Sequence, residues 1–124
     1  MAYAPPRFPP GRPTHFRSTV HGIVFGNRER HLEGMKAGDS LRLQTDPPGS
    51  ALPEVWVHAT SGDPIGHLPP EIGRWLSPWM QGGGRAEATV FQVKGQEVPS
   101  WRRMVVQVAC RTTAEGREGT SRAP

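Results

Sequence analysis

The chain has 124 residues, which suits one small domain, and its 15 glycines and 14 prolines are about twice the usual share. The formal net charge of +4 comes mostly from the two ends of the chain, so composition alone does not indicate a DNA-binding domain. Its single cysteine, Cys110, excludes an internal disulfide and a zinc site built from cysteines.

The two ends differ from the middle in composition. Residues 1–14 contain five prolines, which fix the backbone and remove hydrogen-bond donors, so this segment is predicted to be a disordered arm. Residues 112–124 lack large apolar side chains and are predicted to be a disordered tail. The folded domain is therefore expected at 15–111. The chain has no signal-peptide pattern and no apolar run of ~20 residues, so a cytoplasmic protein without membrane contact is expected.

The sequence of the middle of the chain predicts mainly β-strands. Residues 27–35 predict one or two helical turns with Leu32 and Met35 facing inward. Gly22 lies inside the first predicted strand and indicates a bulge or a close approach by another segment. Residues 61–63, "SGD", predict a hairpin turn. The segments rich in β-branched residues or alternating in polarity are 16–25, 40–45, 54–60, 64–68, 85–93 and 102–110.

One helix is predicted after the fourth strand. Pro70 suits the first helical turn, where its missing N–H is not needed, and Gly82 to Gly84 should end the helix. Pro78 should loosen the last turn. The apolar residues that share one helical face are Ile72, Trp75, Leu76, Trp79 and Met80. The fold class is therefore predicted to be mainly β with one principal α-helix, which plugs one end of a curved antiparallel sheet.

Catalytic signatures are absent from the sequence. No phosphate-binding loop of the Walker type and no G-x-S-x-G nucleophile motif occurs. The five histidines form no pair at metal-ligand spacing, and no motif places two carboxylates for acid–base work. We therefore expect a non-enzymatic binding module that uses no cofactor and no metal.

Three segments resemble the HIRAN domain, a module found fused to helicase-like remodelling ATPases and in small bacterial proteins. They are "VHGIVFGN" (20–27), "GDSLRL" (38–43) and "IGHLPPEIGRWLSPWMQGG" (65–83). The resemblance covers about 20–110, and its most specific part is the Ile-Gly-His-Leu-Pro run. It implies a small OB-like or SH3-like antiparallel β-barrel. It also implies binding of single-stranded DNA ends, in DNA repair or replication.

Carried over residue by residue, the resemblance implies a nucleic-acid site of Phe25, His67, Asp46 and Arg42. Phe25 matches a stacking aromatic residue, and the His67 imidazole is placed to donate to a phosphate. Asp46 belongs to a retained Asp-Pro pair. The Asn, aromatic and Asp residues that follow this pair in the family are replaced here by "GSAL" (49–52). Binding is therefore expected to be weak and to show little preference for a free 3′ hydroxyl.

A second hypothesis is that the chain is a protein-interaction module that has lost the DNA pocket. The segment "VPSW" (98–101) and the proline-rich arm are its candidate contact sites. A positively charged surface around the candidate site would favour DNA, and a large apolar patch would favour a protein partner. The sequence does not predict the oligomeric state.

Overall fold

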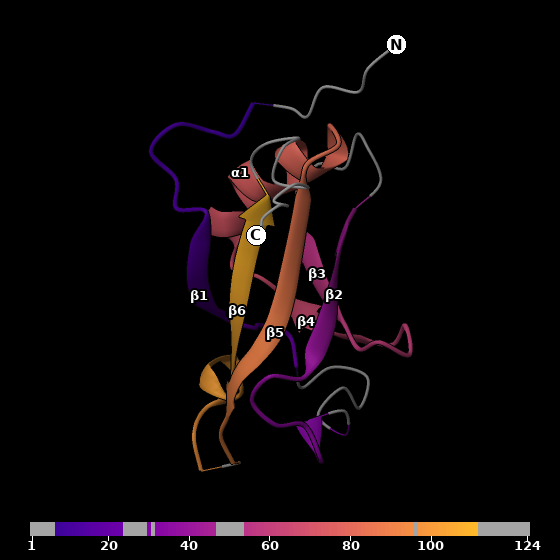
Figure 1. Cartoon of the computed structure of the whole chain (residues 1–124). Helices are drawn as coiled ribbons and strands as arrows, with labels where there is room; N and C mark the ends of the chain where they lie inside the picture. The colour runs from indigo at the N-terminus through magenta and orange to yellow at the C-terminus, as the bar shows by residue number, and fades with distance from the viewer. Residues whose placement is uncertain (1–6, 24–29, 31, 47–53, 96, 112–124) are drawn as a thin grey trace, which may run out of the picture.

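The computed structural model describes residues 7–23, 30, 32–46, 54–95 and 97–111. Six strands form one antiparallel sheet in the order β1-β6-β5-β2-β3-β4, with one α-helix beside it (Figure 1). The elements are β1 (His15–Thr19), β2 (Ser40–Thr45), β3 (Val55–His58), β4 (Pro64–His67), α1 (Pro70–Gln81), β5 (Arg85–Val93), the 3₁₀ helix η2 (Ser100–Arg102) and β6 (Met104–Arg111). The prediction of a mainly β fold with one principal helix is confirmed.

The sheet curls because the two ends of β2 pair with different strands. Ser40 and Leu41 pair with β5, whereas residues 42–45 pair with β3. The two edges of the sheet meet just after β1, where the backbone groups of His21 and His67 exchange hydrogen bonds of 2.8 and 2.9 Å. The result is a partly closed barrel, consistent with the predicted OB-like architecture.

Gly66 allows this contact between the two edges. A Cβ atom at position 66 would lie 2.3 Å from the carbonyl oxygen of His21 and 2.7 Å from Val20 Cγ1. Because real Cβ atoms do not approach backbone atoms this closely, only glycine permits the His21–His67 bridge. Gly66 of the Ile-Gly-His run is therefore needed for the two edges of the sheet to meet.

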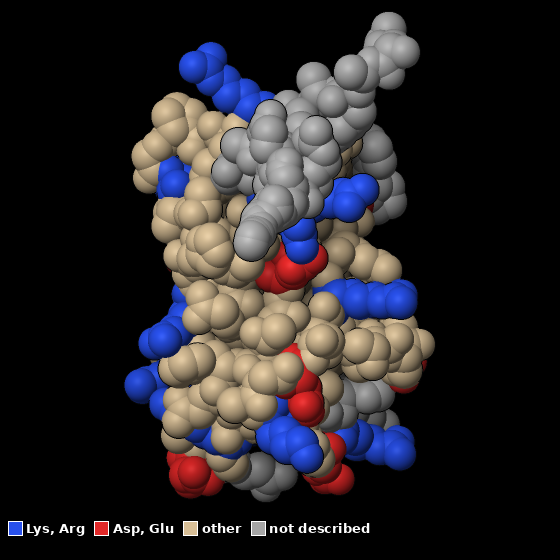
Figure 2. Space-filling model, viewed as in Figure 1, with Lys and Arg blue, Asp and Glu red and all other residues tan. Residues whose placement is uncertain are grey.

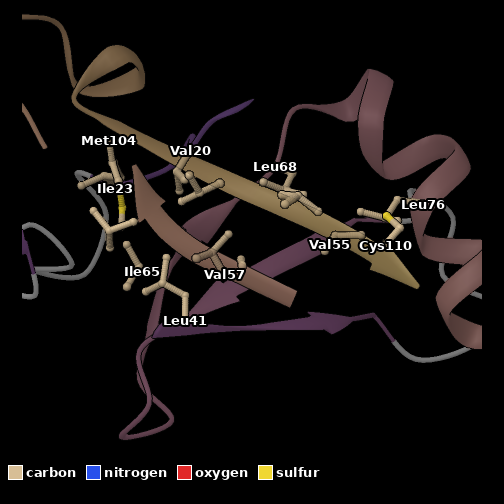
Figure 3. Packing of buried hydrophobic residues seen from close by; sticks show 14 of the residues in the cluster. Val20, Ile23, Leu41, Val55, Val57, Ile65, Leu68, Leu76, Met104 and Cys110 are labelled. Carbon is tan, nitrogen blue, oxygen red and sulfur yellow. The ribbon is translucent and has the colours of Figure 1, made fainter. Parts of the chain in front are cut away.

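The inner face of the sheet forms the hydrophobic core. Alternate residues of β6 point inward, and Met104, Val106, Val108 and Cys110 are all buried. Figure 3 shows Met104 and Cys110 with core residues from β2, β3 and β4, and it shows Cys110 beside Leu76 of α1. Leu32 is also buried, and Met35 is partly buried against the core, so both face inward as the sequence predicts.

Helix α1 begins at Pro70 and ends at Gln81, as the sequence predicts. Leu76 and Trp79 are buried, while the other three residues of the predicted apolar face, Ile72, Trp75 and Met80, are half-buried against the core. Gly84 permits the packing of Trp79, because a Cβ at position 84 would lie 2.3 Å from the indole ring.

The first strand is shorter than the predicted range of 16–25. β1 ends at Thr19, and the backbone at Gly22 has a positive φ of 78°. This conformation favours glycine and turns the chain away from the sheet after the His21 bridge. No helix in the described part of the chain is long and apolar enough to cross a membrane.

Part of the proline-rich arm contacts the helix. Phe8 meets the rings of Trp75 and Trp79 edge-on, with centroid distances of 5.7 and 5.1 Å. The Arg12 guanidinium carbon lies 5.7 Å from the Trp75 ring centroid. The predicted domain limits, with disordered segments at 1–14 and 112–124, stay predictions. Residues 1–6 and 112–124 lie outside the described residues.

Candidate nucleic-acid interface

The outer face of β2, β3 and β4 gathers polar and aromatic side chains. In the register of these strands Arg42 lies opposite His58, and Trp56 lies opposite His67. The neighbouring residues along β3, Val55 and Val57, point to the other face and are fully buried. This alternation fixes the four polar and aromatic side chains on the outer face of the barrel.

Trp56 lies at the centre of this face. Its indole N–H donates a hydrogen bond of 2.9 Å to Oδ1 of Asp46, which follows the end of β2. Its ring meets the His67 imidazole edge-on, with a centroid distance of 5.4 Å. These two contacts hold the indole in place. Because Trp56 is only half-buried, part of the indole is still exposed to solvent.

Asp46 also connects this face to the helix. Its backbone carbonyl accepts a hydrogen bond of 2.7 Å from the side-chain amide of Gln81, the last residue of α1. The carboxylate of Asp46 is engaged with the Trp56 indole. Asp46 therefore orients Trp56 relative to the rest of the domain.

His67 is oriented by its own neighbours. Its Nδ1 atom lies 3.0 Å from the carbonyl oxygen of Leu68, and because a carbonyl only accepts, Nδ1 carries the proton and donates. In the neutral ring Nε2 is therefore an acceptor, and it becomes a donor when the ring gains a second proton. The His21 ring lies 6.0 Å away, and its Nε2 atom is 3.3 Å from the Thr19 hydroxyl. Two imidazoles thus lie side by side at the barrel seam.

The structure brings together three of the four site residues expected from the sequence. His67 lies on β4, Asp46 follows β2 and contacts His67's neighbour Trp56, and Arg42 lies exposed on the same outer face. The fourth, Phe25, lies outside the described residues. So do residues 49–52, which replace the family's pocket residues in the sequence. Their roles stay predictions.

Sequence reasoning missed Trp56 and His21. The signal for Trp56 was present, because an aromatic residue between Val55 and Val57 in an alternating strand must lie on the face opposite the core. His21 gave no local signal, since its neighbour His67 lies 46 positions further along the chain and meets it only through barrel closure. Only the three-dimensional fold shows that His21 lies beside His67.

Two solved structures are similar to this one. A protein from Lactobacillus plantarum superposes with a TM-score of 0.63 at 14% sequence identity, covering 76% of this chain and 89% of the other. The HIRAN domain of human HLTF superposes with a TM-score of 0.56 at 20% identity, covering 86% of this chain and 83% of the other. The chain has a HIRAN-like fold. No family model and no curated protein matches this chain by sequence.

Proposed function

We propose that this chain is a non-enzymatic module that binds single-stranded DNA on the outer face of β2, β3 and β4. The observation that carries the proposal is the placement of Trp56, His67 and Arg42 on one exposed face of the barrel. An aromatic ring, an imidazole and a guanidinium are the groups that stack on bases and donate to phosphates. The HIRAN-like fold supports the proposal.

Each residue has a distinct role in the proposed site. A base stacks on the exposed part of Trp56, and Arg42 donates to the phosphate backbone. His67 donates through Nε2 when its ring is protonated. Asp46 acts as a positioning residue, because its negative carboxylate would repel a phosphate but holds the indole N–H. The carried-over stacking role of Phe25 is kept as part of the proposal.

The described side chains outside the proposed site give no reason to propose an enzyme. Within the described ranges no group of three or more His, Cys, Asp or Glu side chains could hold a metal ion. Cys110, the only cysteine, is buried, and burial raises the pKa of its thiol to about 11. Such a thiol is a poor nucleophile at neutral pH. A role in DNA repair or replication remains part of the proposal, carried only by the family resemblance.

The proposal is tested by titrating labelled single-stranded DNA into the full chain at two salt concentrations. Replacing Trp56 by alanine removes the stacking surface and should cost ~1–3 kcal/mol of binding free energy. Arg42→Ala should reduce both the affinity and its salt dependence. The control is Arg74→Ala, which removes the same charge from an exposed position on α1 and should leave binding unchanged.

The same titration tests recognition of the 3′ end. The sequence departs from the family at residues 49–52, so we expect a 3′-phosphate and a 3′-hydroxyl oligonucleotide to bind about equally. A strong loss on blocking the 3′ end would show that the hydroxyl is recognised after all. Wild-type protein that fails to bind DNA at low salt would overturn the proposed function.

One observation favours protein interaction as a second candidate function. Trp101 on η2 is 53% exposed, with the Arg102 guanidinium 5.7 Å from its ring, and tryptophan and arginine are both enriched at protein–protein interfaces. Trp101→Ala should leave DNA affinity unchanged if the first proposal holds. If DNA does not bind at low salt, the Trp101 surface becomes the leading candidate.

A further inference from the structure

A row of polar side chains crosses the outer face of β1, β6, β5 and the beginning of β2. Arg17 on β1 lies opposite Gln107 on β6, which lies opposite Thr89 on β5, which lies opposite Ser40 on β2. These residues point outward because their neighbours along the strands face the core. The buried neighbours are Ser18, Val106, Val108, Ala88, Val90 and Leu41.

Arg17 is held in place at one end of this row. Its guanidinium carbon lies 3.8 Å from the centroid of the Phe91 ring, a close cation–π contact. Its Nε donates a hydrogen bond of 3.2 Å to Gln107 Oε1, and the Gln107 amide in turn donates to the Phe16 carbonyl oxygen. The Arg17 guanidinium is therefore oriented while its side chain remains exposed.

The charge along this row is positive. Arg42 lies two residues beyond Ser40 on β2, so arginines stand near both ends. Glu87 on the same face of β5 is neutralised by an ion pair of 3.1 Å with Arg111. Figure 2, drawn from the viewpoint of Figure 1, shows basic side chains at the left and right edges of this face, with uncharged surface and some acidic side chains between them.

We propose that single-stranded DNA bound at Trp56 and Arg42 continues across β2, β5 and β6 and ends on the Arg17–Phe91 pair. This inference rests on the proposed function and extends its footprint. Three strand spacings separate β2 from β1, or ~14 Å, which spans a few nucleotides. Ser40, Thr89 and Gln107 supply hydroxyl and amide donors for phosphate and sugar oxygens along the way. Arg17 supplies a cation and a flat surface on which a base stacks.

The experiment compares oligothymidylates of about two nucleotides, too short to reach from Trp56 to Arg17, and of about twelve nucleotides, within the range of OB-fold site sizes. Wild-type protein should bind the longer strand more tightly. Arg17→Ala, Arg17→Gln and Phe91→Ala should each weaken binding of the longer strand about tenfold and leave the shorter strand unaffected. The matched control is Arg74→Ala, and thermal unfolding of each variant checks that the fold is intact.

The outcomes separate this inference from the proposed function. Equal affinity for both lengths, or Arg17 variants that bind the longer strand like wild type, would overturn the extended footprint and leave the Trp56 site standing. Equal losses in Arg17→Ala and Arg74→Ala would also overturn it, since any lost charge would then have the same effect. Absence of binding to both lengths would overturn the proposed function itself.

Discussion

Two tryptophan clusters lie in different surroundings. On α1, Trp79 is 4% exposed and Trp75 half-buried, and they contact Phe8 and Phe16 through ring faces and edges. On β3, Trp56 is half-buried and is held by a hydrogen bond to Asp46 and an edge contact with His67. The ring contacts of the first cluster are with phenylalanines, whereas those of the second include a hydrogen bond to a carboxylate and a contact with an imidazole.

The difference shows how one residue type serves stability in one place and recognition in another. A buried indole among rings stabilises the fold through the apolar area that it removes from water. An indole fixed by a carboxylate on an outer sheet face adds less to stability, and its exposed part is oriented for a ligand. Substitutions that separate stability from binding can therefore test the comparison.

The largest expected effect is on stability at the helix. Trp79→Ala should lower the free energy of unfolding by ~3–5 kcal/mol, because it leaves a large cavity between α1 and the sheet. Trp56→Ala should cost clearly less. Chemical denaturation of both variants measures the difference. Equal losses would mean that Trp56 is also a core residue and that the two clusters are alike.

Gly66 links the two edges of the sheet beside the Trp56 cluster. Gly66→Ala should destabilise by ~1–3 kcal/mol, because the new Cβ would clash with the His21 carbonyl and Val20. It should also weaken DNA binding, since His67 lies at the seam and Trp56, on β3, lies next to His67. Unfolding and DNA titration on the same sample test both effects. A variant as stable as wild type would show that the His21–His67 bridge does not close the barrel.

Phe8 tests how firmly the arm is held by the α1 cluster. Phe8→Ala should lower the free energy of unfolding by ~1–3 kcal/mol, because each of its two edge-to-face contacts is worth ~0.5–1.5 kcal/mol. DNA binding should not change, because Phe8 lies on the helix side of the molecule. Thermal unfolding and the same DNA titration measure the two effects. An unchanged melting temperature would mean that the arm does not pack on α1 in solution, in agreement with the predicted disorder of residues 1–14.

The smallest expected effect at neutral pH concerns Cys110, which is buried beside Leu76 under α1. Burial raises the pKa of its thiol from 9.0 to about 11, so native protein should react very slowly with thiol reagents at pH 8. Above pH 9 the unfolded thiol ionises while the folded one keeps its proton. Stability should therefore fall between pH 9 and about 11, and Cys110→Ala should remove that part of the decline. Rapid native labelling at pH 8 would contradict this burial.

The helix and the strands could be predicted from the sequence because their signals are local. The spacing of Leu76 and Trp79 and the flanking prolines and glycines define α1, and alternation defines the strands. The end of β1 at Thr19 could not be predicted, because the apolar run continues to Ile23 while the backbone leaves the sheet at Gly22. Barrel closure decides that end.

The candidate site was predicted in part for the same reason. His67, Asp46 and Arg42 belong to segments with a recognisable pattern, and they lie on or beside one face. Their relation depends on Trp56, which joins Asp46 to His67 through strand pairing and a side-chain bond between positions 46 and 56. The Arg17–Phe91 pair joins β1 to β5 across β6, and no local pattern in the sequence indicates it.

The most direct test follows the indole N–H signals of the four tryptophans by NMR as single-stranded DNA is added. The signal of Trp56 should shift in proportion to occupancy, because its N–H lies in the proposed site, while the signal of the buried Trp79 should stay in place. Single Trp→Phe variants assign the four signals. A shift confined to Trp101, or no shift at saturating DNA, would contradict binding on the outer face of β2, β3 and β4.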